Sequence, residues 1–205
     1  MAYIKASVRR GQMVAAARAA LARDGVANTT LRTIAAEAQV PLGTLYYIFP
    51  TKQQVITAVL EDAQDEVTAV FTATPTRGGL DHALRQALDS YWKQLIVNDP
   101  QQALMRQELY LYALRTPGQQ HLARWQIEGY TRIVSEWSQQ TATNAGEVCA
   151  VPFDTLARAV VGGVLGIVMQ YLSDPDKARS QRDLHALADM LVSLAAPQAS
   201  NTARD

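Results

Sequence analysis

Residues 30–52 read TLRTIAAEAQVPLGTLYYIFPTK and contain two short helical patterns separated by a tight turn. The first pattern predicts a helix over 31–38, with Thr29 or Thr30 as its N-cap. The second predicts a helix over 41–48 that begins with a proline, which is favoured in a first helical turn because its missing N–H would be unpaired there. This arrangement is typical of a helix-turn-helix, which presents its second helix to the major groove of DNA.

The second helix of this pair has two unlike sides. On a helical wheel, an apolar side of Leu45, Ile48 and Phe49 faces away from Gly43, Thr44 and Tyr47. The apolar side can anchor the helix in a core while the other side reads DNA. Hydrogen-bond donors suited to phosphates and base edges are supplied by Arg32, Thr33, Thr44, Tyr46, Tyr47 and Lys52. The alternative is a helix-turn-helix that never touches DNA, since this geometry is common among helical proteins.

The rest of the chain also shows helical periodicity, and strand-like alternation is hard to find, so the predicted fold class is all-α with about nine helices. The further helices are placed over 7–23, 51–73, 80–97, 100–115, 119–142, 153–172 and 180–195. The first of these ends at Asp24-Gly25. We predict a DNA-binding domain over 1–52, linked by helix 51–73 to an effector-binding and dimerisation domain over 53–197, and a disordered tail over 198–205.

Charge is distributed unevenly along the chain. The 205 residues contain 19 Lys and Arg and 19 Asp and Glu, which gives a formal net charge of zero. Residues 1–52 nevertheless hold seven basic and two acidic residues, a net charge of +5, and the remainder is therefore at −5. The basic excess coincides with the helix-turn-helix pattern, as expected if this part alone approaches nucleic acid.

Several classes of function find little support. The longest stretch without charged or strongly polar residues, 159–169, is shorter than the roughly 20 residues of a membrane-spanning helix. A single cysteine, Cys149, cannot form an internal disulfide, and a reducing cytoplasm is expected. The histidines are His82, His121 and His185, too far apart for a metal site. With no phosphate loop and no nucleophile motif, neither an enzyme nor a cofactor is predicted.

The segment Ile34-Ala35-Ala36-Glu37-Ala38, followed by Gly43-Thr44-Leu45-Tyr46-Tyr47-Ile48-Phe49 and Lys52, closely resembles the signature of TetR-family transcriptional regulators. Residues 108–115 also resemble a segment of one subset of that family. Two positions depart from the family pattern. Gln39 stands where glycine is usual and is expected to strain a left-handed turn by about 1 kcal/mol, and Pro41 stands where a serine-like cap is usual.

The resemblance implies roles for individual residues. Thr30 would cap the second helix beside the DNA backbone, while Tyr46 and Lys52 would hold phosphates. Leu45 and Phe49 are expected in the core. The DNA-contacting residues predicted in this way are Thr30, Arg32, Thr33, Pro41, Leu42, Gly43, Thr44, Tyr46, Tyr47 and Lys52.

The resemblance also implies that the remaining helices bind a small effector and pair two subunits. Residues 90–137 hold seven of the eleven Trp and Tyr residues, which favours an apolar pocket there, with an aromatic core as the alternative. The predicted pocket residues are Trp92, Met105, Glu108, Tyr112, Trp125, Tyr130 and Met169. The predicted interface is a four-helix contact in a homodimer, with a subunit core as the alternative. Its residues are Val161, Val164, Leu165, Val168, Leu187 and Leu191.

These features predict a ligand-responsive regulator, a repressor that leaves a palindromic double-stranded DNA operator when an unknown small-molecule effector binds. The alternative is a helical small-molecule-binding or scaffold protein that does not bind an operator. The departures at Gln39 and Pro41 keep that alternative open.

Overall fold

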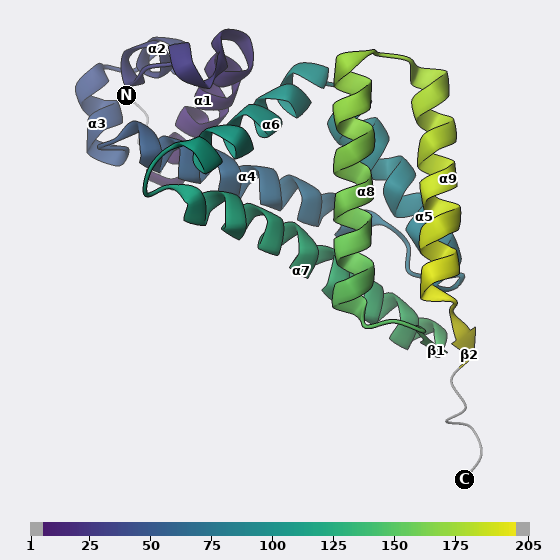
Figure 1. Ribbon diagram of the computed structural model, residues 1–205. Helices are drawn as coiled ribbons and strands as arrows, with labels where there is room; N and C mark the ends of the chain where they lie inside the picture. The colour runs from purple at the N-terminus through teal and green to yellow at the C-terminus, as the bar shows by residue number, and fades with distance from the viewer. Residues whose placement is uncertain (1–5, 200–205) are drawn as a thin grey trace. The chain divides into compact units, whose positions relative to one another are not determined.

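A computed structural model describes residues 6–199, and Figure 1 shows that helices make up nearly all of them. Nine α-helices occur within that range: α1 Ala6–Asn28, α2 Leu31–Glu37, α3 Leu42–Ile48, α4 Lys52–Ala73, α5 Gly79–Tyr91, α6 Pro100–Arg115, α7 Gln120–Ala145, α8 Phe153–Ser173 and α9 Lys177–Ala195. A π-helical segment, Trp92–Val97, continues α5. The strands β1, Glu147–Val148, and β2, Gln198–Ala199, have two residues each. The predicted all-α class is confirmed.

The helix ends differ from prediction in ways that have local causes. Gly25, with φ 77° and ψ 162°, interrupts α1 where the sequence predicted its end, and one further turn runs on to Asn28. The predicted start of the third helix was wrong by one residue, because Pro41 has an extended ψ of 139° and acts as the N-cap. Its carbonyl accepts a 2.9 Å hydrogen bond from the N–H of Thr44.

Two other predictions near the second half of the chain need correction. The helix predicted over 80–97 changes to π-helical geometry after Tyr91, and the N–H of Asn98 bonds five residues back to the Lys93 carbonyl. The tail predicted to be disordered from residue 198 begins with a paired strand, since Gln198 and Ala199 pair antiparallel with β1. Backbone hydrogen bonds, which composition does not reveal, order these two residues. The rest of that tail lies outside the described residues.

The chain divides into two compact units whose limits differ from the predicted domains. The first runs to Asp65 and also includes Gln101–Gln126, whereas the second comprises Glu66–Pro100 and the residues from Ile127 onward. In the first unit the helix-turn-helix shares one core with α6. Met13, Ile34, Leu45 and Leu109 are all at most 1% exposed in that core. The sequence had assigned α6 to the C-terminal domain.

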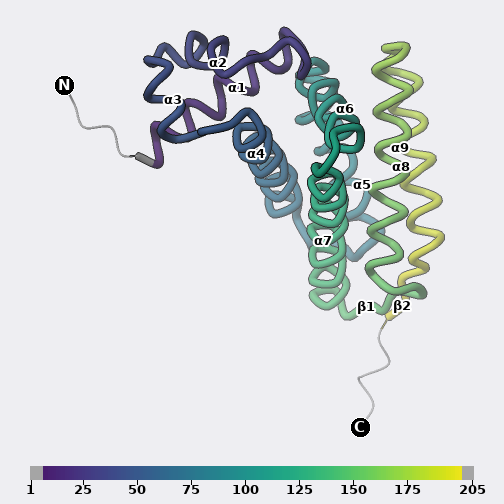
Figure 2. The backbone as a smooth tube through the Cα atoms, turned by 60° about the vertical axis from the view of Figure 1, so that its left-hand side comes forward, coloured from purple at the N-terminus to yellow at the C-terminus, as the bar shows by residue number. Residues whose placement is uncertain are grey.

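In the second unit, α8 and α9 run side by side, as Figures 1 and 2 both show. Gly163 makes their close approach possible. A Cβ at Gly163 would lie 2.5 Å from Cδ1 of Leu187, whereas a Cβ at Gly162 or Gly166 would meet nothing within 4 Å. The glycine needed within the subunit is therefore Gly163, and the other two face outward.

Candidate DNA interface and effector cavity

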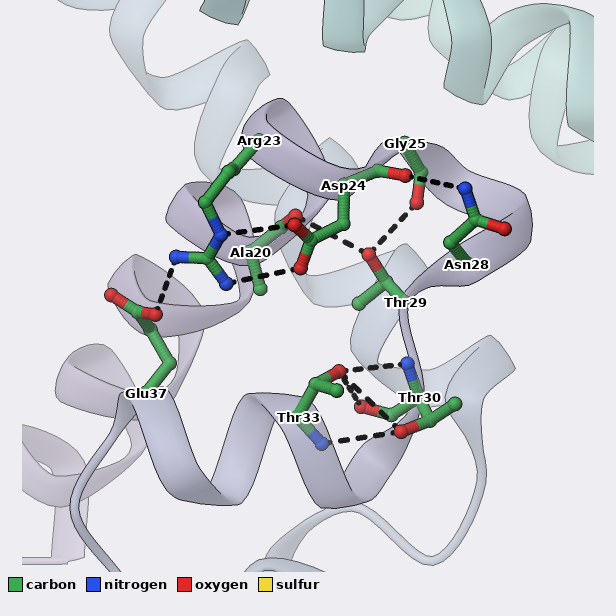
Figure 3. Close-up of polar contacts among 9 residues, drawn as sticks. All are labelled: Ala20, Arg23, Asp24, Gly25, Asn28, Thr29, Thr30, Thr33 and Glu37. Carbon is green, nitrogen blue, oxygen red and sulfur yellow. Dashed lines mark hydrogen bonds and ion pairs between the residues drawn. The ribbon is translucent and has the colours of Figure 1, made fainter.

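The start of α2 is fixed by reciprocal hydrogen bonds between two threonines (Figure 3). The N–H of Thr33 donates to Oγ1 of Thr30 at 3.2 Å, and the N–H of Thr30 donates to Oγ1 of Thr33 at 2.9 Å. This capping box satisfies two backbone donors that the first helical turn leaves without partners. Thr30 remains exposed. The capping role predicted for Thr30 is confirmed.

Arg23 connects α1 to α2 on the surface (Figure 3). Its guanidinium bonds both carboxylate oxygens of Asp24, at 2.9 and 3.0 Å, and donates to Glu37 at 2.7 Å. These bonds raise the pKa of Arg23 and, from the other side, lower the pKa of Asp24. Asp24 and Glu37, the two acidic residues of 1–52, are thus both bound by one arginine. The positive charge of Arg23 partly neutralises both carboxylates and so weakens their repulsion of an incoming phosphate.

The third helix has the two sides that its sequence predicted. Leu45 is fully buried and Phe49 is 3% exposed, whereas Tyr47 is 89% and Tyr46 47% exposed. Gly43 is also exposed, and a Cβ there would meet nothing within 4 Å. The helix is therefore anchored by one side and leaves a side with a small residue and phenol groups open to a partner.

The basic residues of the first unit are not equally available. Arg10 pairs with Glu61 at 3.3 Å, and Arg18 pairs with Asp62 at 2.5 Å. Within the described part of the chain, Arg32 has no carboxylate within 4 Å. Since Arg32 is also exposed, its charge is open to a phosphate or a base edge.

Lys52 is placed differently from the other predicted phosphate ligands. Its ammonium donates to the backbone carbonyl of Val26 and lies 6.0 Å from the ring centre of Tyr112. Partial burial lowers the pKa of Lys52. In this arrangement the side chain joins the end of α1 to the start of α4. A contact between Lys52 and phosphate remains a prediction.

The ten residues predicted to contact DNA all lie in α2, α3 or the segments next to them in the first unit. Six are exposed: Thr30, Arg32, Pro41, Gly43, Tyr46 and Tyr47. The other four, Thr33, Leu42, Thr44 and Lys52, are half-buried. The turn and α3 also border a groove whose other wall is α1, which contributes Arg9 and Gln12. Arg9 and Gln12 are not among the residues predicted to contact DNA, although the exposed residues on one side of α1 were a signal for this wall.

The second unit contains an apolar cavity of about 410 Å³, a volume that includes the part open to solvent. Helices α4, α5, α7 and α8 supply its lining. The lining residues are Val67, Phe71, Leu88, Tyr91, Tyr130, Val134, Val160, Val161, Val164 and Leu165.

Of the seven residues predicted for an effector pocket, Tyr130 lines this cavity. Trp92 packs edge-on against Tyr171 with ring centres 5.4 Å apart, and Met169 is exposed. The other four lie in the first unit and are Met105, Glu108, Tyr112 and Trp125. Glu108 accepts a hydrogen bond from the N–H of Val26 at 3.2 Å. The structure therefore does not bring these seven side chains together around one cavity.

The residues predicted for the dimer interface are mostly covered within the subunit. Val161, Val164 and Leu165 line the cavity, and Val168, Leu187 and Leu191 are buried. The side of α8 and α9 that is open instead carries Gly162, Gly166, Met169, Met190 and Leu194. A cavity wall and a subunit contact both need apolar residues. The sequence alone therefore does not show which of the two Val160, Val161 and Val164 belong to.

Two further features bear on the class of protein. Among the described residues, α8 is the one helix long and apolar enough to cross a membrane by length and composition, a test that core helices of soluble proteins also pass. In the same part of the chain, no three His, Cys, Asp or Glu side chains gather as a metal site would require.

The helix-turn-helix part of the chain matches a known family. Residues 13–59, which include the whole helix-turn-helix, match the family described as bacterial regulatory proteins, tetR family. The chain is also 28% identical over 172 residues to the HTH-type nicotine-responsive transcriptional repressor HdnoR of Paenarthrobacter nicotinovorans, a match that covers 83% of the chain and 87% of the relative. TetR-family proteins are DNA-binding regulators rather than enzymes.

Solved structures show the same fold. Salmonella enterica GusR matches with a TM-score of 0.76 at 21% identity and covers 94% of this chain and 98% of its own. The multidrug binding protein EbrR, complexed with malachite green, matches with a TM-score of 0.64 at 26% identity and covers 91% of this chain and 98% of its own. The likeness therefore extends over both units.

Proposed function

We propose that this chain is a cytoplasmic, homodimeric repressor of the TetR family that binds a palindromic DNA operator and releases it when a small molecule enters the cavity of the second unit. The observation that carries the DNA part is the contrast between Leu45, which is fully buried, and Tyr47, which is 89% exposed two residues later. Readout in a major groove requires a helix that is held by one side and open on the other.

The ten predicted residues divide by the kind of DNA contact proposed for them. Residues on the open side of α3 enter the groove, where Gly43 allows the DNA to approach the backbone closely. Arg32, exposed on α2, meets phosphate or base edges. Thr30 and Thr33 fix the start of α2 through the bonds that cap it, and this start lies beside the DNA backbone in the proposed complex. Tyr46 lies beside the groove and contacts phosphate.

Two subunits are needed because one short helix reads one half-site, and successive half-sites lie about 34 Å apart on the DNA. We place the subunit contact on the open side of α8 and α9. Gly162 and Gly166 leave room for another helix there, and Met169 and Met190 are 47% and 63% exposed. The residues predicted from sequence for the interface, such as Val161 and Leu187, are buried beneath this surface and pack within the subunit. Sedimentation analysis at micromolar concentration should give a dimer, and a stable monomer would contradict the proposal.

Effector binding can act through α4, which is a continuous helix belonging to both units. Val55 and Val59 are buried in the core of the first unit, whereas Val67 and Phe71 line the cavity in the second. A molecule in the cavity shifts the conformational equilibrium only by the difference between its affinities for the two states. By linkage, operator DNA must weaken effector binding by the same factor.

The direct test is selection of genomic DNA fragments with the purified protein, followed by gel-shift titration of the recovered sites. We expect a palindromic site and a strong salt dependence of its affinity, because phosphate contacts release counterions. Arg32→Ala should weaken operator binding, and Arg132→Ala, which removes an exposed arginine from α7, is the matched control. Recovery of no palindromic site would favour the alternative of a helical small-molecule-binding or scaffold protein.

A further inference from the structure

The lining of the cavity in the second unit has a composition that restricts what it can bind. Five valines, two leucines and a phenylalanine supply eight of its ten residues, and Tyr91 and Tyr130 supply the other two. Among the described residues that line it there is no Asp, Glu, Lys, Arg or His. From this we infer that the cavity selects uncharged, mainly aromatic or aliphatic molecules and discriminates against both cations and anions. This inference rests on the proposed function, in which the cavity receives the effector.

The competing effect is attraction between a cation and the aromatic rings. Phe71, Tyr91 and Tyr130 present ring faces that can attract an ammonium group. That attraction is smaller than the cost of removing an ammonium from water without a carboxylate to pair with it. An anion lacks even this compensation, because the ring faces are electron-rich. Charge of either sign is therefore disfavoured, and anions more strongly.

The wall around Phe71 is packed by a second aromatic ring and is largely shielded from water. The ring of Phe71 packs edge-on against Trp137, with ring centres 5.2 Å apart and an angle of 76° between the planes. Phe71 is 5% exposed and Val164, also in the lining, is 7% exposed, so little of this wall faces bulk water. Tyr91 and Tyr130 are the two residues of the lining that carry a polar side-chain atom, so the lining as a whole favours ligands with few polar groups.

Three naphthalene probes that differ in charge test this inference. Isothermal titration of the full-length protein at pH 7 would compare 2-naphthol, 2-naphthoate and 2-naphthylmethylammonium. We expect 2-naphthol to bind at least about 10-fold more tightly than the ammonium, with naphthoate weakest, since the cavity offers no counter-ion. A charged probe that binds as tightly as 2-naphthol, or the failure of all three to bind, would overturn the inference.

A pair of substitutions on α8 locates the bound probe. Leu165→Glu places a carboxylate in the lining, where it should raise the affinity for the ammonium and lower that for 2-naphthol. Gln170→Glu adds the same charge at an exposed position of α8 outside the lining and should change neither affinity. Unchanged affinities in Leu165→Glu would show that the probes bind elsewhere, which also overturns the inference. The unmodified protein decides the charge preference by itself if Leu165→Glu does not fold.

Operator binding measured on the same samples tests the proposed repressor function separately from the inferred selectivity of the cavity. If a palindromic operator is bound but the ammonium probe is preferred, the selectivity inferred for the cavity is wrong and the proposed repressor stands. If no operator is found, the proposed function fails whatever the probes do.

Discussion

The surface around α3 and the cavity of the second unit are built on opposite principles. Around α3, exposed polar groups are positioned by hydrogen bonds, such as those between Thr30 and Thr33, and by the buried anchor Leu45. The cavity is lined by side chains from four helices and has scarcely any polar side-chain atoms. The residues of the α3 surface are close together in the sequence, so the spacing of residue types predicts that surface. The cavity depends on how helices distant in the sequence pack, and no sequence motif marks it.

The largest difference is expected when the two sides of α3 are mutated separately. Leu45→Ala removes a fully buried side chain and should lower the free energy of unfolding by about 2–5 kcal/mol. Tyr47→Ala removes an exposed one and should change it by less than about 0.5 kcal/mol, while weakening operator binding about 10-fold or more. Denaturant unfolding and gel-shift titration measure the two effects. Similar destabilisation by both would mean that Tyr47 is part of the core.

A glycine of α8 tests packing within the second unit. Gly163→Ala should lower the free energy of unfolding by about 1–3 kcal/mol, because the new Cβ would lie 2.5 Å from Cδ1 of Leu187 and force the helices apart. Gly11→Ala in α1 is the control, since its Cβ would meet nothing within 4 Å and Gly11 lies outside the proposed subunit contact. It should stabilise the helix by up to about 1 kcal/mol in thermal unfolding. Equal losses for the two variants would contradict the packing of α8 on α9.

Arg32 and Lys52 sharpen the description of the DNA surface. Arg32→Ala should reduce the salt dependence of operator affinity by about one unit of slope, as expected when one phosphate contact is lost. Lys52→Ala removes a hydrogen bond to the Val26 carbonyl and should cost about 1 kcal/mol of stability. Its effect on the slope decides whether Lys52 also reaches phosphate. A slope unchanged in both variants would contradict the proposed DNA surface.

The difference between the two regions also explains what could be predicted from sequence. The two sides of α3 and the cap at Thr30 follow from residues within one or two helical turns of each other, and the structure has them as predicted. Trp92 and Met105 looked equally suitable for a pocket, yet one packs on Tyr171 and the other is buried in the first core. Apolar side chains in a core and around a cavity have the same composition. Only the packing of helices distinguishes them.

The smallest expected effect concerns the turn between α2 and α3, where the backbone strain predicted at Gln39 is found in the structure. Gln39 has a φ of 54°, in the left-handed region that a side chain disfavours. Gln39→Gly should therefore stabilise the protein by up to about 1 kcal/mol, the strain relieved less the larger entropy that glycine has in the unfolded chain.

The matched control is Gln139→Gly in the exposed side of α7, where the backbone is helical. The same substitution there should destabilise by about 1 kcal/mol, because glycine is a poor helix former. Opposite signs in thermal unfolding would show that the turn itself is strained, and not that glycine is tolerated everywhere. Loss of stability at both positions would mean that the Gln39 side chain contributes more than its backbone costs. Because α3 is held through this turn, operator affinity in Gln39→Gly would then report whether that strain helps to fix the reading helix.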